Sequence, residues 1–385
     1  MSQPTAPARR ERIVLTGYFL GLGAVMALWG ARMPAVQHAS DLSTARLSLV
    51  LLAAALGMVA GLTTGGRLAR PQRLPALTIC GGAGLAGCLA VLGQCTTLTS
   101  LILAALAYGA AHGSLDVALN TAAVRCQNAI GGPIMASLHA AYSGGALAGA
   151  GLAAATARMP HTTLFLVTGL VLTATVFSTA SRTRALTGTG QPAVLTGRGA
   201  DDGGQGLPAA KLWLLGALAA AILLGEGAAA DWAAVHLHSL HATTAVSATA
   251  FALYSAAMLG GRLTGDKLTA AVGVPTVVRA GALLAAAGLA TGASAASVPL
   301  ALAGWALFGL GLSTTIPSLI TAAGAGGPTA VATVSVTGYL GLLAGPALIG
   351  TLASATSLST ALLLPALLAA AVATLAHRAL ETPDP

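Results

Sequence analysis

Gly65-Gly66-Arg67-Leu68 and Gly260-Gly261-Arg262-Leu263 are the same tetrapeptide, and each ends a long apolar run. A weaker echo pairs Tyr142-Ser143-Gly144 with Tyr339-Leu340-Gly341 at nearly the same distance downstream. Two copies of one pattern in the two halves of a chain indicate an internal duplication. The repeat predicts two parallel halves of the same architecture.

The stretch between the halves breaks the apolar pattern with Gly, Thr, Asp and Arg. We expect residues 181–209 to form a flexible cytoplasmic linker. On this basis residues 1–180 form an N-terminal six-helix bundle and residues 210–385 a C-terminal one.

Composition makes the lipid bilayer the solvent of most of the chain. Of 385 residues, 56% are hydrophobic and 7% are charged, and the mean hydropathy is +0.83. Soluble domains carry about 25% charged residues, whereas lipid tails accept an uncharged surface. We therefore expect a multi-pass membrane protein.

Apolar stretches long enough to span a bilayer, which takes about 20 residues, recur along the whole chain. They lie near residues 13–31, 47–69, 75–94, 98–124, 134–157, 161–180, 210–235, 244–265, 274–295, 298–320, 328–353 and 356–377. The runs are continuously apolar rather than alternating, which favours helices over barrel strands. The predicted fold is an all-α membrane protein with twelve transmembrane helices in two pseudo-symmetric six-helix bundles.

Basic residues predict the orientation, because positively charged loops stay in the cytoplasm. All but three of the 18 Lys and Arg residues fit one side, the exceptions being Arg32, Arg46 and Arg158. We expect the cell inner membrane as the location, with both termini cytoplasmic. Topology thus explains the net charge of +8, and we expect no nucleic-acid partner because no basic stripe is interleaved with aromatic residues.

The fourth expected span carries polar residues at steps of four, namely Tyr108, His112, Asp116 and Asn120. Residues at this spacing lie on one helix face. Ionisable groups in a span are costly and are functional candidates. Because desolvation disfavours the charged form of a carboxylate, Asp116 with His112 is a candidate for proton coupling. The alternative is that these groups only fix helix packing through hydrogen bonds.

The seventh expected span places two acids among small residues. Glu226 falls near mid-membrane and is a candidate proton or substrate site, whereas Asp231 lies closer to the outer surface, at the depth expected for Arg32. A salt bridge between Arg32 and Asp231 would act as an outer gate; a purely structural ion pair is the alternative. Trp29 and Trp232 lie beside these charges and could stack on a sugar or a cation, or belong to the interfacial aromatic belt.

Motifs for catalysis are missing from the sequence. We find no nucleophile elbow, phosphate-binding loop or pair of catalytic carboxylates in the right context, and we expect neither an enzyme nor a cofactor. Several histidines could suggest a metal, but no carboxylate or Cys stands at ligand spacing. We therefore expect no metal site and interpret as exposed loop residues His38, His236, His238 and His241.

The segment Gly261-Arg262-Leu263-Thr264-Gly265-Asp266-Lys267 resembles the Gly-x-x-x-Asp-Arg type signature of the major facilitator superfamily. The resemblance implies that this segment tethers helix ends on the cytoplasmic side and helps to set the inward and outward states, which gives Arg262 and Asp266 a gating role. The counterpart Gly66-Arg67-Leu68-Ala69-Arg70 lacks the Asp and departs from the signature.

Four further stretches resemble one bacterial subgroup of this family, the MosC-like proteins distantly related to fucose permeases. They are residues 29–34, 116–120, 137–144 and 226–232. The resemblance implies a proton-linked uptake or export carrier of a small polar solute such as a sugar or polyol. Our hypothesis is a monomer that works by alternating access. The expected path is lined by Trp29, Asn120, His139, Tyr142 and Trp232.

Proton-driven efflux of drugs or metabolites is the alternative function. The stretch Gly144-Gly145-Ala146-Leu147-Ala148-Gly149 has no Pro, unlike the fifth-span signature of drug exporters, although Gly345-Pro346 occurs in the eleventh span. A membrane receptor or scaffold is a third class, which would show no solute flux.

Overall fold

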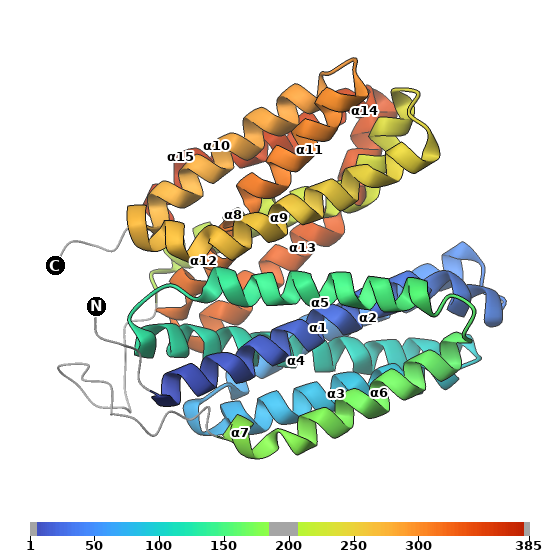
Figure 1. The fold of residues 1–385 in the computed structure, drawn as a ribbon, viewed down its shortest axis with the longest axis vertical. Helices are drawn as coiled ribbons and strands as arrows, with labels where there is room; N and C mark the ends of the chain where they lie inside the picture. Colours follow the sequence, from blue (N-terminus) through green and yellow to red (C-terminus); the bar gives the residue numbers. More distant parts are fainter. Residues whose placement is uncertain (1–5, 185–206, 381–385) are drawn as a thin grey trace. The chain divides into compact units, whose positions relative to one another are not determined.

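The computed structural model describes residues 6–184 and 207–380, and the regular elements in these ranges are helices (Figure 1). In the first half they are α1 (Ala6–Ala39), α2 (Thr44–Leu68), η1 (Pro71–Arg73), α3 (Leu74–Gln94), α4 (Leu98–Ile130), α5 (Met135–Ala155), α6 (His161–Ser178) and α7 (Ala180–Arg184). In the second half they are α8 (Ala209–Ser239), α9 (Thr244–Val272), α10 (Val274–Ala293), α11 (Val298–Leu312), α12 (Thr315–Gly324), α13 (Gly327–Ala355), α14 (Leu358–Ala361) and α15 (Leu363–Leu380).

The all-α membrane fold is confirmed. In the described part of the chain, 10 helical segments are long and apolar enough to cross a membrane. The helices α5 and α9, with 21 and 29 residues, are also long enough for a bilayer core of about 30 Å at about 1.5 Å per residue. Several helices outrun the apolar stretches, because a helix continues into the headgroup layer after its apolar residues end.

The helices pack into two units. Unit 1 contains α1 to α4, α6, α7 and residues 141–155 of α5, and it also takes residues 327–332 of α13. Unit 2 contains α8 to α12, α14, α15 and the rest of α13, together with residues 132–140 at the start of α5. Both helices that divide between the units, α5 and α13, carry the echoed Tyr of the repeat, at Tyr142 and Tyr339.

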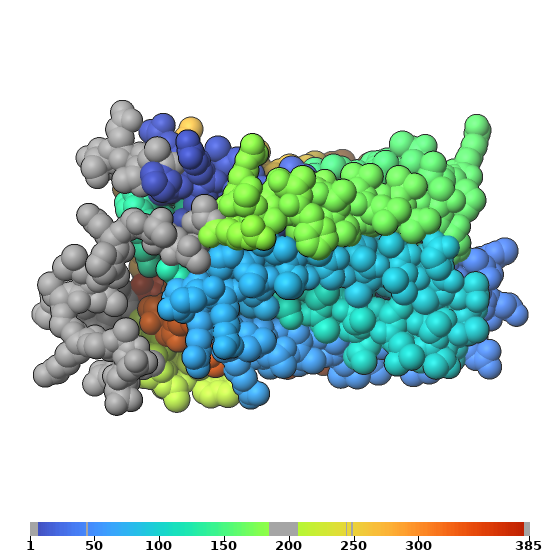
Figure 2. Space-filling view, turned by 90° about the horizontal axis from the view of Figure 1, so that it is seen from below, coloured from blue at the N-terminus to red at the C-terminus, as the bar shows by residue number. Residues whose placement is uncertain are grey.

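Of the expected linker, residues 181–184 belong to α7 and residue 209 begins α8, whereas residues 185–206 lie outside the described residues. The short helix α7 follows α6 after one residue and contacts α3, and Figure 2 shows α6 lying alongside α3 on one face of unit 1.

Close backbone contact holds unit 1 together where α2 crosses α4. A Cβ added at Gly57 would collide with the carbonyl oxygen of Leu106, and one added at Gly109 with that of Ala54. Helices in lipid gain little from a hydrophobic effect between them and associate through such close packing of small residues. The Gly and Ala residues of the chain thus allow its helices to pack closely.

Candidate functional site

A buried polar column follows one face of α4 in unit 1. Tyr108, His112, Asp116 and Asn120 are 2%, 3%, 8% and 2% exposed. The Nδ2 of Asn120 donates to the Asp116 backbone oxygen at 3.0 Å and to its Oδ1 at 3.2 Å. Among the described residues, no Lys or Arg forms an ion pair with Asp116. Its carboxyl group is therefore buried with an amide, and not a cation, as its partner.

Trp29 of α1 packs against this column. Its ring lies 5.1 Å from that of Tyr108 at an interplanar angle of 27°, and 6.5 Å from that of Phe165. The indole is 6% exposed. Tyr108 therefore covers one face of the Trp29 indole, the ring that we expect to stack on a solute.

Arg32 holds the C-terminal end of α5 within unit 1. Its Nη2 donates to the oxygen of Ala153 at 3.0 Å and to Oγ1 of Thr156 at 3.1 Å, and its Nη1 donates to the oxygen of Ala157 at 3.3 Å. The last carbonyls of a helix lack partners within it and favour a cation. The sequence paired Arg32 with Asp231, which lies exposed on α8 in unit 2. The outer gate stays a prediction.

We expect Arg32→Gln to lower the stability of the purified protein by about 2 kcal/mol, the scale of hydrogen bonds to a charged group. Scanning calorimetry or a thermal shift in detergent measures this. Arg158→Gln, at an exposed position just beyond α5, is the matched control. Equal melting temperatures for both variants would contradict the clamp.

Glu226 and Arg262 come together in unit 2. The Oε1 of Glu226 lies 3.8 Å from Nη2 of Arg262, with side chains 21% and 7% exposed. In the described part of the chain no donor hydrogen-bonds to that Oε1. Sequence reasoning assigned these residues to different roles, proton coupling and gating, and missed that they form one ion pair.

A proline explains how Arg262 is held. Pro317 has no N–H, so the carbonyl of Ser313 four residues earlier loses its helical partner, and the helix breaks between α11 and α12. The Nε of Arg262 donates to this freed oxygen at 3.4 Å. The break thus supplies an acceptor beside the Glu226 and Arg262 pair.

Asp266 caps the N-terminus of α5. Its Oδ1 accepts from the backbone N–H of Ala136 at 2.9 Å, and its Oδ2 from that of Ser137 at 3.0 Å. A carboxylate is favoured there by free N–H groups and by the helix dipole. Gly265 permits the approach, because a Cβ at this residue would lie 2.9 Å from Cβ of Ala136.

Asp266→Ala is expected to cost about 1 to 2 kcal/mol by removing this cap. The stability of Asp266→Asn should fall between that of the wild type and that of Asp266→Ala, since an amide keeps one acceptor but carries no charge. Thermal shifts of both variants against Lys267→Ala, an exposed neighbour, provide the measurement. A loss no larger than that of Lys267→Ala would show that the contact contributes nothing.

The remaining expected path residues divide between the units. Tyr142 of α5 is partly buried and lies within electrostatic reach of Tyr108 in unit 1. His139 belongs to the segment of α5 in unit 2 and lies close enough to Arg262 for an electrostatic interaction. Trp232 turns to α13, where its Nε1 donates to the oxygen of Pro346 at 3.2 Å.

Two residues that sequence reasoning missed stand beside these groups. Tyr254 is 3% exposed, and its hydroxyl has no hydrogen-bond partner among the described residues. It precedes Arg262 by two helical turns, so periodicity along α9 places both on one face. Ser313 contributes only its backbone oxygen, and no side-chain pattern signals that.

The interpretation of His236 as an exposed loop residue is wrong. It lies in α8 with 0% exposure, and its Nδ1 accepts from Nε1 of Trp305 at 3.3 Å. The helix extends to Ser239, beyond the apolar stretch, and so carries the imidazole into the packed bundle. Over the described residues no group of three His, Cys, Asp or Glu side chains could hold a metal ion.

Comparison with known proteins places the chain among transporters. No protein-family model matches it. An uncharacterised MFS-type transporter of Yersinia pestis is 33% identical over 353 residues, which cover 90% of this chain and 89% of that protein. The membrane protein MosC of Rhizobium meliloti is 27% identical, with 93% of this chain and 88% of MosC covered.

The structural comparison agrees in fold. The MFS transporter FucP, solved in its outward conformation, superposes with a TM-score of 0.76 over 96% of this chain and 99% of FucP, at 19% identity. The 33% identity with the Yersinia pestis transporter, over nearly the whole of both chains, shows the family. This chain belongs to the major facilitator superfamily of multi-pass membrane transporters, which are not enzymes.

Proposed function

We propose that this transporter carries a small polar solute of the sugar or polyol class, coupled to protons, by alternating access. It works in the cell inner membrane with both termini cytoplasmic. The linker of residues 181–209 joins the two bundles, and the monomer is the working form.

The observation that carries the proposal is one buried carboxyl group in each unit. The side-chain amide of Asn120 donates a hydrogen bond to Asp116, and Glu226 has a guanidinium 3.8 Å away, beyond hydrogen-bond distance. A buried carboxylate with incomplete partners is costly when charged, so binding and release of a proton are coupled to its surroundings. His112, one turn from Asp116, is the neighbouring proton acceptor.

Polar atoms without partners support a hydroxylated solute. The Oδ1 of Asn120 is buried and accepts no hydrogen bond from the described residues, which is costly until a donor arrives. A solute hydroxyl supplies one. Trp29, His139, Tyr142 and Trp232 complete the proposed path. FucP of E. coli, which shares this fold at 18% identity, is a fucose:proton symporter.

Charged groups at helix ends are the proposed gates. Asp266 and Arg262 act where α9 meets the start of α5 and the break before α12. Arg32 acts at the other end of α5, with Asp231 as its proposed outer partner once the clamp opens. Opposite charges at the two ends of α5 match its dipole, so both gates act on one helix.

The deciding experiment is a ligand screen by thermal shift with sugars, polyols and amphipathic drugs. A native-state ligand at 100 times its Kd stabilises by about 2.7 kcal/mol. We expect a sugar or polyol to raise the melting temperature of the wild type and to lose most of this effect in Asn120→Ala.

Asn128→Ala is the matched control, since Asn128 lies exposed on the same helix α4. It should keep the full ligand shift. Stabilisation only by bulky apolar or cationic compounds would contradict the sugar proposal and favour efflux.

A further inference from the structure

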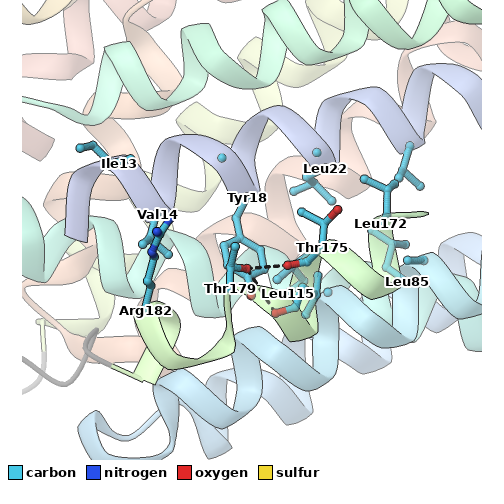
Figure 3. Close-up of a pocket in the computed structure, with 16 residues that line it drawn as sticks. Ile13, Val14, Tyr18, Leu22, Leu85, Leu115, Leu172, Thr175, Thr179 and Arg182 are labelled. Carbon is cyan, nitrogen blue, oxygen red and sulfur yellow. Dashed lines mark hydrogen bonds between the residues drawn. The ribbon is translucent and has the colours of Figure 1, made fainter. Parts of the chain in front are cut away.

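An apolar cavity of about 220 Å³ lies within unit 1, between α1, α3, α4 and α6, with α7 at one end (Figure 3). Its walls are leucines from four helices, namely Leu22, Leu85, Leu115 and Leu172. Gly17 and Gly21 of α1 also line it, and a Cβ at either would meet nothing within 4 Å. None of the residues proposed for transport lines this cavity, so it is a separate feature.

The polar groups of the cavity wall are already engaged. The hydroxyl of Thr175 donates to the oxygen of Val171 at 2.8 Å, and that of Thr179 to the oxygen of Thr175 at 2.7 Å. The hydroxyl of Tyr18 bonds that of Thr183 at 3.2 Å. An apolar cavity with satisfied walls does not hold ordered water, so its natural occupant is a hydrocarbon chain.

A single charge stands at the end of the cavity. Arg182 of α7 is the charged member among the described residues that line it, and its side chain is exposed. Figure 3 shows it directed from α7 toward Val14 of α1. The cavity is therefore apolar, with one cation among the described residues that line it.

The surroundings of the cavity face lipid. Leu170, Val171 and Phe177 of α6 are 59%, 58% and 61% exposed. In a transmembrane helix such apolar exposure is covered by acyl chains. Arg182 and Arg184 follow directly where α6 ends, at the level expected for headgroups.

We propose that this cavity binds one anionic phospholipid, with an acyl chain between α1, α3 and α6 and the phosphate on Arg182. Charge selects this occupant. A cationic amphipath would be repelled by the guanidinium, and a small polar solute would find no free hydrogen-bonding group in the wall. A zwitterionic lipid can fill the cavity, but its own ammonium group competes with Arg182 for the phosphate.

Native mass spectrometry of the detergent-purified full chain tests the proposal. After titration with phosphatidylglycerol or phosphatidylcholine of equal chain length, we expect the wild type to bind one phosphatidylglycerol about fivefold more tightly, the effect of one basic residue near an anionic surface. Arg182→Gln should remove this preference and keep phosphatidylcholine binding. Gly21→Leu, which fills the cavity, should weaken the binding of both lipids.

Two controls keep the result specific. Arg73→Gln changes an exposed basic residue at the same end of α3, and Gly87→Leu adds a side chain in open space on α3; neither residue lines the cavity, so both should behave as the wild type. An unchanged preference in Arg182→Gln, an unchanged affinity in Gly21→Leu, or displacement of the lipid by cationic amphipaths at wild-type Arg182 would overturn the proposal.

Discussion

Asp116→Asn should abolish proton-driven accumulation of the solute while leaving its downhill exchange intact. The substitution keeps the size of the side chain and an acceptor for Nδ2 of Asn120, 3.2 Å away, but the amide cannot bind and release a proton. The solute then equilibrates across the membrane and is no longer concentrated. Reconstituted vesicles with an imposed pH gradient measure accumulation, and counterflow in the same vesicles measures exchange.

Asp41→Asn is the control for this experiment. Asp41 lies in the loop between α1 and α2 with a φ of 48°, a conformation that Asn also tolerates, and it should accumulate solute as the wild type does. Full accumulation in Asp116→Asn would exclude this residue from coupling. Loss of both accumulation and exchange would instead assign Asp116 to solute binding or to packing.

Arg262→Met should destabilise the protein by about 2 kcal/mol, because it leaves the carboxylate of Glu226 buried without its cation. Breaking a fully buried pair costs about 3 to 5 kcal/mol, and the 21% exposure of Glu226 reduces the loss. Glu226→Gln in the Arg262→Met background should recover part of it, since the uncompensated charge is then gone. Melting temperatures of the four proteins form the double-mutant cycle.

The repeat provides the matched control. Arg67 stands in the first copy of the tetrapeptide and is exposed, so Arg67→Met should leave the melting temperature nearly unchanged. Additive effects of the Glu226 and Arg262 substitutions would show that the pair contributes no coupling. A loss in Arg67→Met as large as that in Arg262→Met would assign the effect to the tetrapeptide and not to the ion pair.

The sequence alone determined the helical membrane fold and the two-half layout. Hydropathy is a local property that depends on some 20 consecutive residues. The tetrapeptide repeat can also be recognised from the sequence, without knowledge of any tertiary contact. Helical periodicity likewise placed Tyr108, His112, Asp116 and Asn120 on one face of α4, and all four are buried.

Only the tertiary structure decided which groups meet. Arg67 and Arg262 lie in identical tetrapeptides. Arg67 is exposed, whereas Arg262 is buried beside Glu226, with 6% of its surface exposed. Nothing in the sequence indicated that Arg32 donates to carbonyl groups at the C-terminal end of α5 within unit 1, because those acceptors belong to the backbone. Periodicity fixes the face of a helix on which a residue lies, whereas the partner of that face depends on how distant helices pack.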